Sequence, residues 1–253
     1  MRIKAIFTLS LFIMIGMGFI THAQEPTAKE IVQTATDKLN GKSSKGEMKM
    51  TIIRPEWSRE ISMKVWSLGT EYYMIYITAP ARERGQVFLK RHEDMWNYMP
   101  NIDRMIKIPP SMMMQSWMGS DFTNNDLVKV SSMVEDYNHS IIGQDSLLEY
   151  DCWIIQFDPK PNAAVVWGKI EMWISKEEYY ELKAKYYDED GELVNKETMS
   201  DIEQMGDRRL PSHMEMVPVD EEGHKTVMDF IDMKFNVDLQ PEFFSIQNMK
   251  RVR

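Results

Sequence analysis

Apolar residues alternate with polar ones through most of the chain, which is the pattern of β-strands with one buried face. Met48, Met50 and Ile52, for example, are separated by Lys49 and Thr51. Segments of this kind recur at the roughly 8–12-residue spacing that is typical of β-sandwiches and barrels. The predicted strands are Met48–Ile52, Ile61–Val65, Glu71–Thr78, Gln86–Arg91, Asp94–Tyr98, Arg104–Ile108, Ser140–Gly143, Cys152–Asp158, Trp167–Ile174, Leu182–Tyr187, Val194–Met205, Ser212–Val217 and Lys225–Phe235.

Helical periodicity is confined to two places. Pro26 to Leu39 carries apolar residues at helical spacing and is followed by Gly41, a residue that commonly ends a helix. A second helix is expected near Asn124–Val130. There is no alternation of strands with long helices, no internal repeat and no low-complexity linker. We therefore expect residues 24–253 to form one β-dominated domain.

Two predicted strands are apolar on both faces, which a sheet with one solvent-facing side does not require. In Glu71–Thr78 and in Cys152–Phe157, large side chains occupy consecutive positions. Helices packed against the concave side of a curved sheet would cover the second apolar surface, and a cavity for an apolar ligand is the other explanation. The 23 methionines in the chain favour an adaptable interior.

The N-terminus has the features of a secretory signal peptide. Arg2 and Lys4 precede an uncharged, largely apolar run from Ala5 to Ile20, which is shorter than the about 20 residues of a membrane span. Cleavage is expected before Gln24, which makes residues 1–23 the signal peptide, and a retained anchor is the alternative. No cysteine lies near this position, so we expect a soluble, exported, periplasmic protein without an N-terminal lipid.

The net charge and the single cysteine further limit the functions that we expect. The net charge of −9 becomes −11 once Arg2 and Lys4 are removed with the signal peptide, and so acidic a chain is not expected to bind nucleic acid. Cys152 has no second cysteine with which to form an internal disulfide. Its position in an apolar strand predicts a small buried side chain rather than a reactive thiol.

The segment from Met95 to Leu127 stands out because it combines seven methionines with two tryptophans and a Pro-Pro pair. Three of the methionines are consecutive and follow Pro109-Pro110, so no single strand or helix can bury all three on one face. These residues either fill an irregular core or form an adaptable apolar surface for a ligand. The seven methionines are Met95, Met99, Met105, Met112, Met113, Met114 and Met118.

The same segment carries a family resemblance. The run Trp96-Asn97-Tyr98-Met99-Pro100, then Arg104, then Met118 to Thr123 (MGSDFT) and the pair Asp126-Leu127 resemble the signature of LolA-like outer-membrane lipoprotein-sorting proteins (the LolA, LolB and LppX type of fold). Later residues follow the order and approximate spacing of the family as well, so that the resemblance covers most of the mature chain. These are Gly143, Tyr150 to Trp153, Trp173-Ile174, Tyr187-Asp188, Gly191 and Lys196.

The resemblance implies a fold and a function. The implied fold is mainly β with a few helices: a strongly curved, incompletely closed antiparallel β-barrel with helices plugging the concave side. The implied function is a periplasmic carrier that shields the acyl chains of a lipoprotein or lipid on the way to the outer membrane. Its cargo would be the acylated protein or lipid, and its partners an inner-membrane transporter and an outer-membrane acceptor.

The candidate lipid-binding residues are the apolar side chains of the methionine-rich segment. We expect the Pro109-Pro110 and Gly119-Ser120 pairs to act as hinges of a lid formed by this segment. Three arginines, Arg82, Arg84 and Arg104, would meet a lipid headgroup or lock the lid, or would simply be solvated. The candidates for the cavity lining or lid are Trp96, Tyr98, Met105, Met112, Met113, Met114, Trp117, Met118 and Phe122.

Enzymatic activity is not expected, and neither is a cofactor or a bound metal. The chain lacks a nucleophile elbow, a phosphate-binding glycine loop and a dinucleotide fingerprint. Its histidines are scattered, without the spacing of a metal site. Two other hypotheses stay open: a Met-rich protein that handles Cu(I) through thioethers, and a sensor of lipid or peptide that works with a membrane transporter.

Overall fold

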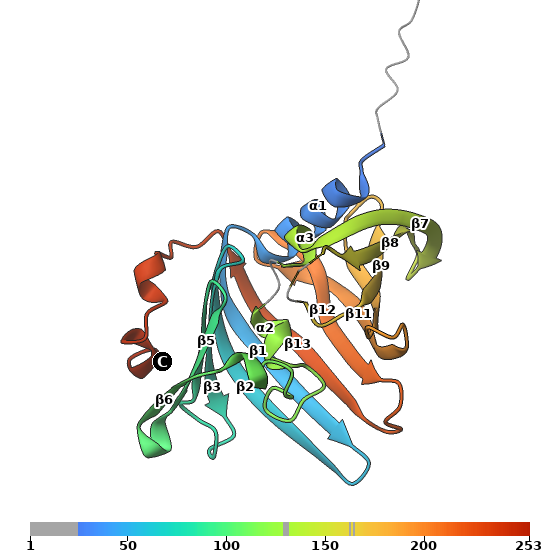
Figure 1. The fold of residues 1–253 in the computed structure, drawn as a ribbon. Helices are drawn as coiled ribbons and strands as arrows, with labels where there is room; N and C mark the ends of the chain where they lie inside the picture. The colour runs from blue at the N-terminus through green and yellow to red at the C-terminus, as the bar shows by residue number, and fades with distance from the viewer. Residues whose placement is uncertain (1–24, 129–131, 162, 164) are drawn as a thin grey trace, which may run out of the picture.

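A computed structural model describes residues 25–128, 132–161, 163 and 165–253; the expected signal peptide lies outside the described residues. Within this part of the chain, the strands form one antiparallel sheet that curves strongly and does not close on itself (Figure 1). The strands are β1 (Ser43–Arg54), β2 (Trp57–Leu68), β3 (Tyr72–Ala79), β4 (Val87–Arg91), β5 (Asp94–Met99), β6 (Arg104–Lys107), β7 (Tyr137–Leu147), β8 (Tyr150–Pro159), β9 (Lys169–Ser175), β10 (Glu181–Tyr187), β11 (Leu193–Met205), β12 (Arg208–Pro218) and β13 (Lys225–Phe235).

The sheet consists of two meanders joined at its centre. Its strand order is β6-β5-β4-β3-β2-β1-β13-β12-β11-β10-β9-β8-β7, so every neighbouring pair except β1 and β13 is consecutive in the sequence. β1 pairs with β13 from Ser44 opposite Phe235 to Ile53 opposite Lys225. The edge strands are β6 and β7. The expected fold class, mainly β with an open and curled antiparallel sheet, is confirmed.

The first helix lies over the end of the sheet near β7 and β9 (Figure 1). α1 (Ala28–Asn40) begins at Thr27, whose side chain accepts a hydrogen bond from the backbone of Glu30 while the Glu30 carboxylate accepts one from the backbone of Thr27. This reciprocal arrangement satisfies backbone donors at the start of the helix. Ile31 and Val32 are buried in a cluster with residues of β7 to β10. The prediction of a helix over Pro26–Leu39 is correct to within two residues.

The remaining described helices are short. α2 (Asn124–Val128) falls within the predicted second helix, and α3 (Ser132–Glu135) follows it. Four single-turn 3-10 helices complete the structure: η1 (Pro100–Ile102), η2 (Pro110–Met112), η3 (Pro241–Phe243) and η4 (Asn248–Lys250). None of the described helices is long and apolar enough to cross a membrane.

The two apolar faces of β3 are buried by different partners. Ile75 and Ile77 face the concave side and belong to the main core. Met74 faces the other side, where Phe244 and Met249 of the C-terminal segment cover it. The C-terminal segment runs along the outside of β3 to β6 (Figure 1). The second apolar surface of β3 is therefore explained by a terminal segment that the sequence pattern did not predict.

The second such strand, β8, also buries both faces. Ile155 and Phe157 lie in the cluster beneath α1. On the other face, Cys152 packs with Trp173, Tyr180 and Leu182. The thiol is fully buried, and burial raises its pKa. The prediction that Cys152 is a small buried side chain is thus confirmed.

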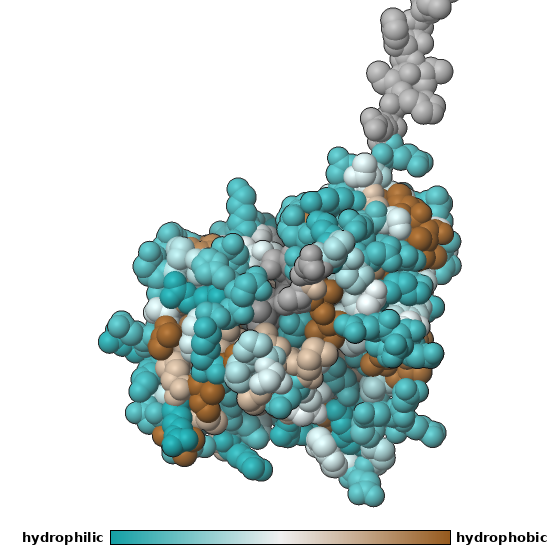
Figure 2. All heavy atoms as spheres, in the orientation of Figure 1, coloured by the Kyte–Doolittle hydropathy of each residue, from teal (hydrophilic) through white to brown (hydrophobic). Residues whose placement is uncertain are grey.

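The outer surface is mostly hydrophilic. On the face drawn in Figure 2, hydrophobic side chains gather in separate small patches, one of them over β7. Ile141 and Ile142 of β7 are both exposed there. Apolar surface in such small pieces is ordinary for a globular protein. The larger apolar area lies on the concave side of the sheet.

Candidate functional site

An apolar cavity of about 290 Å³ lies on the concave side of the sheet. Its walls come from both meanders, from α1 and α2 and from the segment 165–167, which precedes β9. Six methionines line it: Met48, Met133, Met172, Met214, Met216 and Met228. Because the thioether side chain is unbranched and polarizable, such walls adapt to apolar ligands of different shapes.

A second, smaller hollow of about 100 Å³ adjoins the cavity. The two share Leu39, Met48, Tyr73 and Phe230 as walls. The smaller hollow continues towards Met233 at the end of β13. A ligand that displaced one of the shared side chains would join the two spaces.

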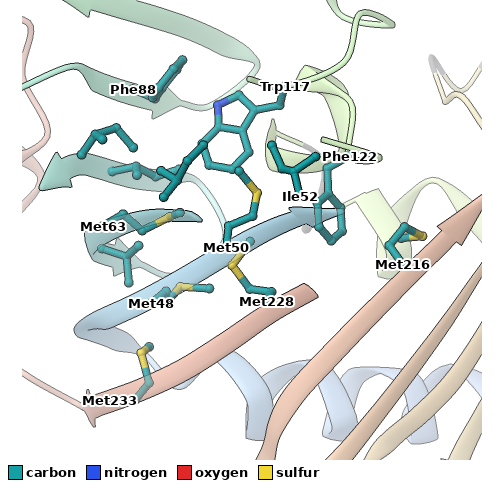
Figure 3. Packing of buried hydrophobic residues seen from close by; sticks show 14 of the residues in the cluster. Met48, Met50, Ile52, Met63, Phe88, Trp117, Phe122, Met216, Met228 and Met233 are labelled. Carbon is teal, nitrogen blue, oxygen red and sulfur yellow. The ribbon is translucent and has the colours of Figure 1, made fainter. Parts of the chain in front are cut away.

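The loop between β6 and α2 fills the part of the concave side next to the cavity. Trp117 and Phe122 reach from this loop onto the methionines of β1 and β13 (Figure 3). The Trp117 ring meets Phe88 edge-on, with ring centroids 5.5 Å apart, and its side chain is 1% exposed. Trp117 is thus part of the main core, and its indole nitrogen has no hydrogen-bond partner among the residues that the structure describes.

The MGSDFT motif fastens this loop to the sheet. Both oxygens of Asp121 accept hydrogen bonds from Arg54 of β1, at 2.9 and 3.2 Å. The Thr226 hydroxyl donates a third, at 2.6 Å, and in turn accepts one from the backbone nitrogen of Asp121. The carbonyl of Gly119, which has a positive φ, accepts another from Arg54. The motif therefore joins the loop to both central strands by buried, charge-assisted hydrogen bonds.

Of the nine predicted lining or lid residues, Phe122 lines the cavity. Trp117 lies in the adjacent core, where Met113 and Met118 pack against it half-buried. Met112 and Met114 are exposed to solvent, at 39% and 58%. These four methionines and Trp117 thus pack in the core next to the cavity or face water.

The other three predicted residues lie on the opposite face of the sheet. Trp96, Tyr98 and Met105 pack on the cluster that contains Phe244 and Met249 of the C-terminal segment. The structure separates them from the cavity because alternate side chains of β5 and β6 point to opposite faces. Sequence proximity to the MGSDFT motif did not reveal this.

The three predicted arginines are exposed and lie outside the cavity lining. Arg82 and Arg84 occupy the connection between β3 and β4, where Arg84 donates to the carbonyl of Thr78 at 2.8 Å. The neighbouring carbonyl of Arg82 accepts a hydrogen bond from the side chain of Asn101 in η1. Arg104 begins β6 just beyond η1. The three side chains therefore belong to one end of the first meander.

The cavity has an acidic side that the sequence analysis missed. Glu181 of β10 and Glu197 of β11 line it, and burial raises the pKa of each to about 7. The hydroxyl of Tyr186 donates to Glu197 at 3.0 Å, and burial raises the pKa of this tyrosine as well. The pKa of Asp126, at the start of α2, is also raised by burial. Glu197 shares one face of β11 with Asn195 and Met199, and all three are buried. Two of the three are polar, so the alternation of apolar residues does not identify this face as buried.

The basic group of the lining, Lys90, lies in the first meander. Its side chain is 4% exposed and donates a hydrogen bond to the carbonyl of Thr70. Burial lowers the Lys90 pKa to about 8, against the opposing effect of Glu93 and Glu71. The cavity therefore carries one basic side chain on β4 and several acidic ones on β10, β11 and α2.

One group of side chains has the composition of a metal site. Asp121, Glu221 and His224 offer ligand atoms within 4.8 Å of one another. Both oxygens of Asp121, however, already accept hydrogen bonds from Arg54 or Thr226. We therefore assign no metal to this group, because Asp121 already holds the loop on the sheet.

The described residues form an open, curled antiparallel sheet with an apolar cavity on its concave side. A family model with the description "Uncharacterized protein" matches residues 69–251, well over half of the chain, and the chain belongs to the family of that model. The LolA-like resemblance found in the sequence is confirmed at the level of the fold. No curated protein matches the chain.

Solved structures agree on the fold. A DUF1329 family protein from Desulfovibrio piger is 24% identical, with a TM-score of 0.80 over 88% of this chain and 97% of that one. A putative outer-membrane lipoprotein-sorting protein domain from Vibrio parahaemolyticus is also 24% identical, with a TM-score of 0.78 over 88% and 98%. A LolA superfamily protein from Nitrosomonas europaea is 22% identical, with a TM-score of 0.75 over 88% and 99%. At these identities the likeness concerns the fold alone.

Proposed function

We propose that this protein is an exported, non-catalytic carrier that binds the apolar chain of a lipid or of an acylated protein. The observation that carries the proposal is the methionine-lined cavity on the concave side of the sheet. Burial of a methylene group is worth about 0.8 kcal/mol, so an alkyl chain in this cavity gains affinity with every carbon that leaves water. An enclosed, mainly apolar cavity with a few polar groups is the usual form of a ligand site.

The size of the cavity limits what it holds. Its volume of about 290 Å³ is at the lower end of the range of about 300–1,000 Å³ for ligand pockets. A single alkyl chain suits this volume, whereas two or three chains would need the walls to move apart. The adjoining hollow and the flexible methionines provide a route for such an expansion.

The description of one similar structure supports the proposed cargo class. The similar domain from Vibrio parahaemolyticus is described as an outer-membrane lipoprotein-sorting protein. Acylated proteins and lipids are therefore the cargo we propose, moved through the periplasm after cleavage before Gln24. A membrane transporter as donor and an outer-membrane acceptor would complete the route.

The proposal is tested by native mass spectrometry on residues 24–253, purified from an exported preparation without detergent and then titrated with a fluorescent fatty-acid probe. We expect co-purifying lipid or saturable probe binding near one per chain. Met214→Trp, on β12, places a larger ring in the half-buried lining and should weaken probe binding at least tenfold.

The matched control is Ile231→Trp. Ile231 lies on β13, is 59% exposed and does not line the cavity. It should leave probe binding unchanged. If wild-type protein binds neither lipid nor probe, the carrier proposal is wrong. Uptake of Cu(I) or of a peptide by such a protein would support one of the two other hypotheses.

A further inference from the structure

The acidic side of the cavity is chemically incomplete in the described structure. Glu197 is 8% exposed and lines the cavity, and its Oε2 atom accepts the hydroxyl of Tyr186. No hydrogen bond to its Oε1 atom and none to either oxygen of Glu181 is found among the described residues. Glu181 is half-buried, and these oxygens are open to the cavity rather than enclosed by protein, so a ligand in the cavity can reach them.

No cation of the described lining compensates these carboxyl groups. The groups that act electrostatically on Glu197 are Glu181 and Asp126, which are acidic like itself. Lys90, the basic residue of the lining, is subject instead to Glu71 and Glu93. Among the described residues, Lys90 thus has acidic neighbours, whereas the charged groups that act on Glu197 are acidic as well.

Among the acidic residues, Asp126 already has a structural role. Its carboxylate accepts hydrogen bonds from the backbone nitrogen and the hydroxyl of Thr123, at 2.7 and 2.8 Å, and so caps α2. Glu181 and Glu197 have no such role. They are therefore the groups that are free to bind a ligand.

We propose that the cavity recognises an amphiphile with a protonated amine at its head, whose ammonium group lies between Glu181 and Glu197 and whose alkyl chain lies along the methionine wall. An ammonium group supplies three donors and one positive charge, which match the free carboxylate oxygens. Tyr186 holds Glu197 in place by its hydrogen bond. This inference rests on the carrier function and adds the headgroup chemistry of the cargo.

The pH dependence of binding follows from the groups that face this point. Glu181 and Glu197 each have a pKa of about 7 in the empty cavity because of burial. Asp126 of α2, Tyr186 of β10 and Tyr137 of β7 also border it, and the pKa of each is raised by burial. An ammonium ligand favours the ionised carboxylates, so its affinity should rise as the pH increases from 6 to 8.5. A neutral ligand of the same length should not gain affinity over this interval.

The test compares dodecylamine, dodecanol and dodecanoate by isothermal titration on the chain from residue 24 to residue 253. At pH 8.5 we expect the amine to bind at least tenfold more tightly than the alcohol, and the preference to fall below threefold at pH 6. Glu181→Gln combined with Glu197→Gln should abolish the preference while retaining the affinity for dodecanol. Each single substitution should reduce it in part.

The matched control is Glu203→Gln, which removes a carboxylate from the exposed face of the same strand as Glu197. It should retain the full amine preference, and circular dichroism and thermal melting should show that all variants fold. Equal binding of amine and alcohol by wild-type protein, a preference for dodecanoate, or an amine preference that survives the double substitution would overturn the inference. In each of these cases the carrier function still stands. Failure of all three ligands to bind would reject the carrier function itself.

Discussion

The two halves of the concave face are built from the same kind of residue but are filled differently. Over the part of β1 to β4 around Met50 and Phe88, Trp117 from the loop covers the wall and fills the space. Over β10 to β13, methionines such as Met214 and Met216 face a cavity that contains acidic side chains. Methionine richness alone therefore does not distinguish core from binding site. What distinguishes them is whether an aromatic side chain from the chain itself occupies the space.

The largest effect is expected from removal of the aromatic side chain that fills the concave face over β1 to β4. Trp117→Ala should reduce the free energy of unfolding by about 3–5 kcal/mol, because a large buried side chain leaves a cavity behind. Denaturant unfolding followed by circular dichroism measures this change. Trp57→Ala, at a position that is 49% exposed, is the control and should cost no more than about 0.5 kcal/mol. A small loss for Trp117→Ala together with loss of ligand binding would show instead that Trp117 is a lid residue.

A somewhat smaller effect is expected where the loop is fastened to the central strands. Asp121→Ala leaves Arg54 buried without its partner, and the side chains are only 7% and 11% exposed. Breaking such a pair from one side costs about 3 kcal/mol, which thermal unfolding will reveal. Lys29→Ala removes the exposed ion pair with Glu135, where a loss of less than about 1 kcal/mol is expected. Equal effects at the two sites would contradict the fastening role of the motif.

The smallest of the three effects on stability concerns Glu197, in the half of the concave face over β10 to β13, and it depends on pH. Burial raises the pKa of Glu197 from 4.5 to about 7. Between pH 4.5 and pH 7, this carboxyl group is therefore protonated in the folded state and ionised in the unfolded state. The contribution of Glu197 to stability is therefore complete below pH 4.5 and is lost as the pH rises through 7. Glu197→Gln should raise the free energy of unfolding by about 2 kcal/mol at pH 8.5, since one pKa unit corresponds to about 1.4 kcal/mol and neighbouring acids share the shift.

At pH 5 the same substitution should have almost no effect. Thermal unfolding at both pH values, with Glu203→Gln as the exposed control, makes the comparison. A stabilisation of equal size at pH 5 and pH 8.5 would mean that ionisation of Glu197 is not responsible.

Much of the fold was predictable from the sequence because its signal is local. The alternation of Met48, Met50 and Ile52 follows directly from the two-residue period of a strand, and all thirteen predicted strands overlap observed ones. The exposed ends of long strands are harder to predict from the sequence. β7, for example, extends from Tyr137 to Leu147, although only Ser140–Gly143 was predicted. Backbone pairing with β8 holds these ends, and backbone pairing needs no apolar pattern.

The location of the cavity was not predictable in the same way. A strand with two apolar faces shows that both are covered, but it does not show by what. One face of β3 is covered by Phe244 and Met249, which are far from β3 in the sequence. The lining residues Glu181 and Glu197 lie on the paired neighbouring strands β10 and β11, but the alternation of residues does not show that their side chains border a cavity.

The pairing of β1 with β13 has a consequence for how the protein reaches its native state. Each meander is built from hairpins between consecutive strands, so each half can form from contacts that are close in the sequence. The pairing of β1 with β13, which joins the two halves, brings Ser44 opposite Phe235. It can therefore form only when nearly the whole chain is present. Because loop closure over such a distance is slow relative to local hairpin formation, we expect the last step of folding to be the joining of two preformed halves. The cavity has walls from both halves and comes into existence only at that step, so a chain that lacks β13 has no formed cavity.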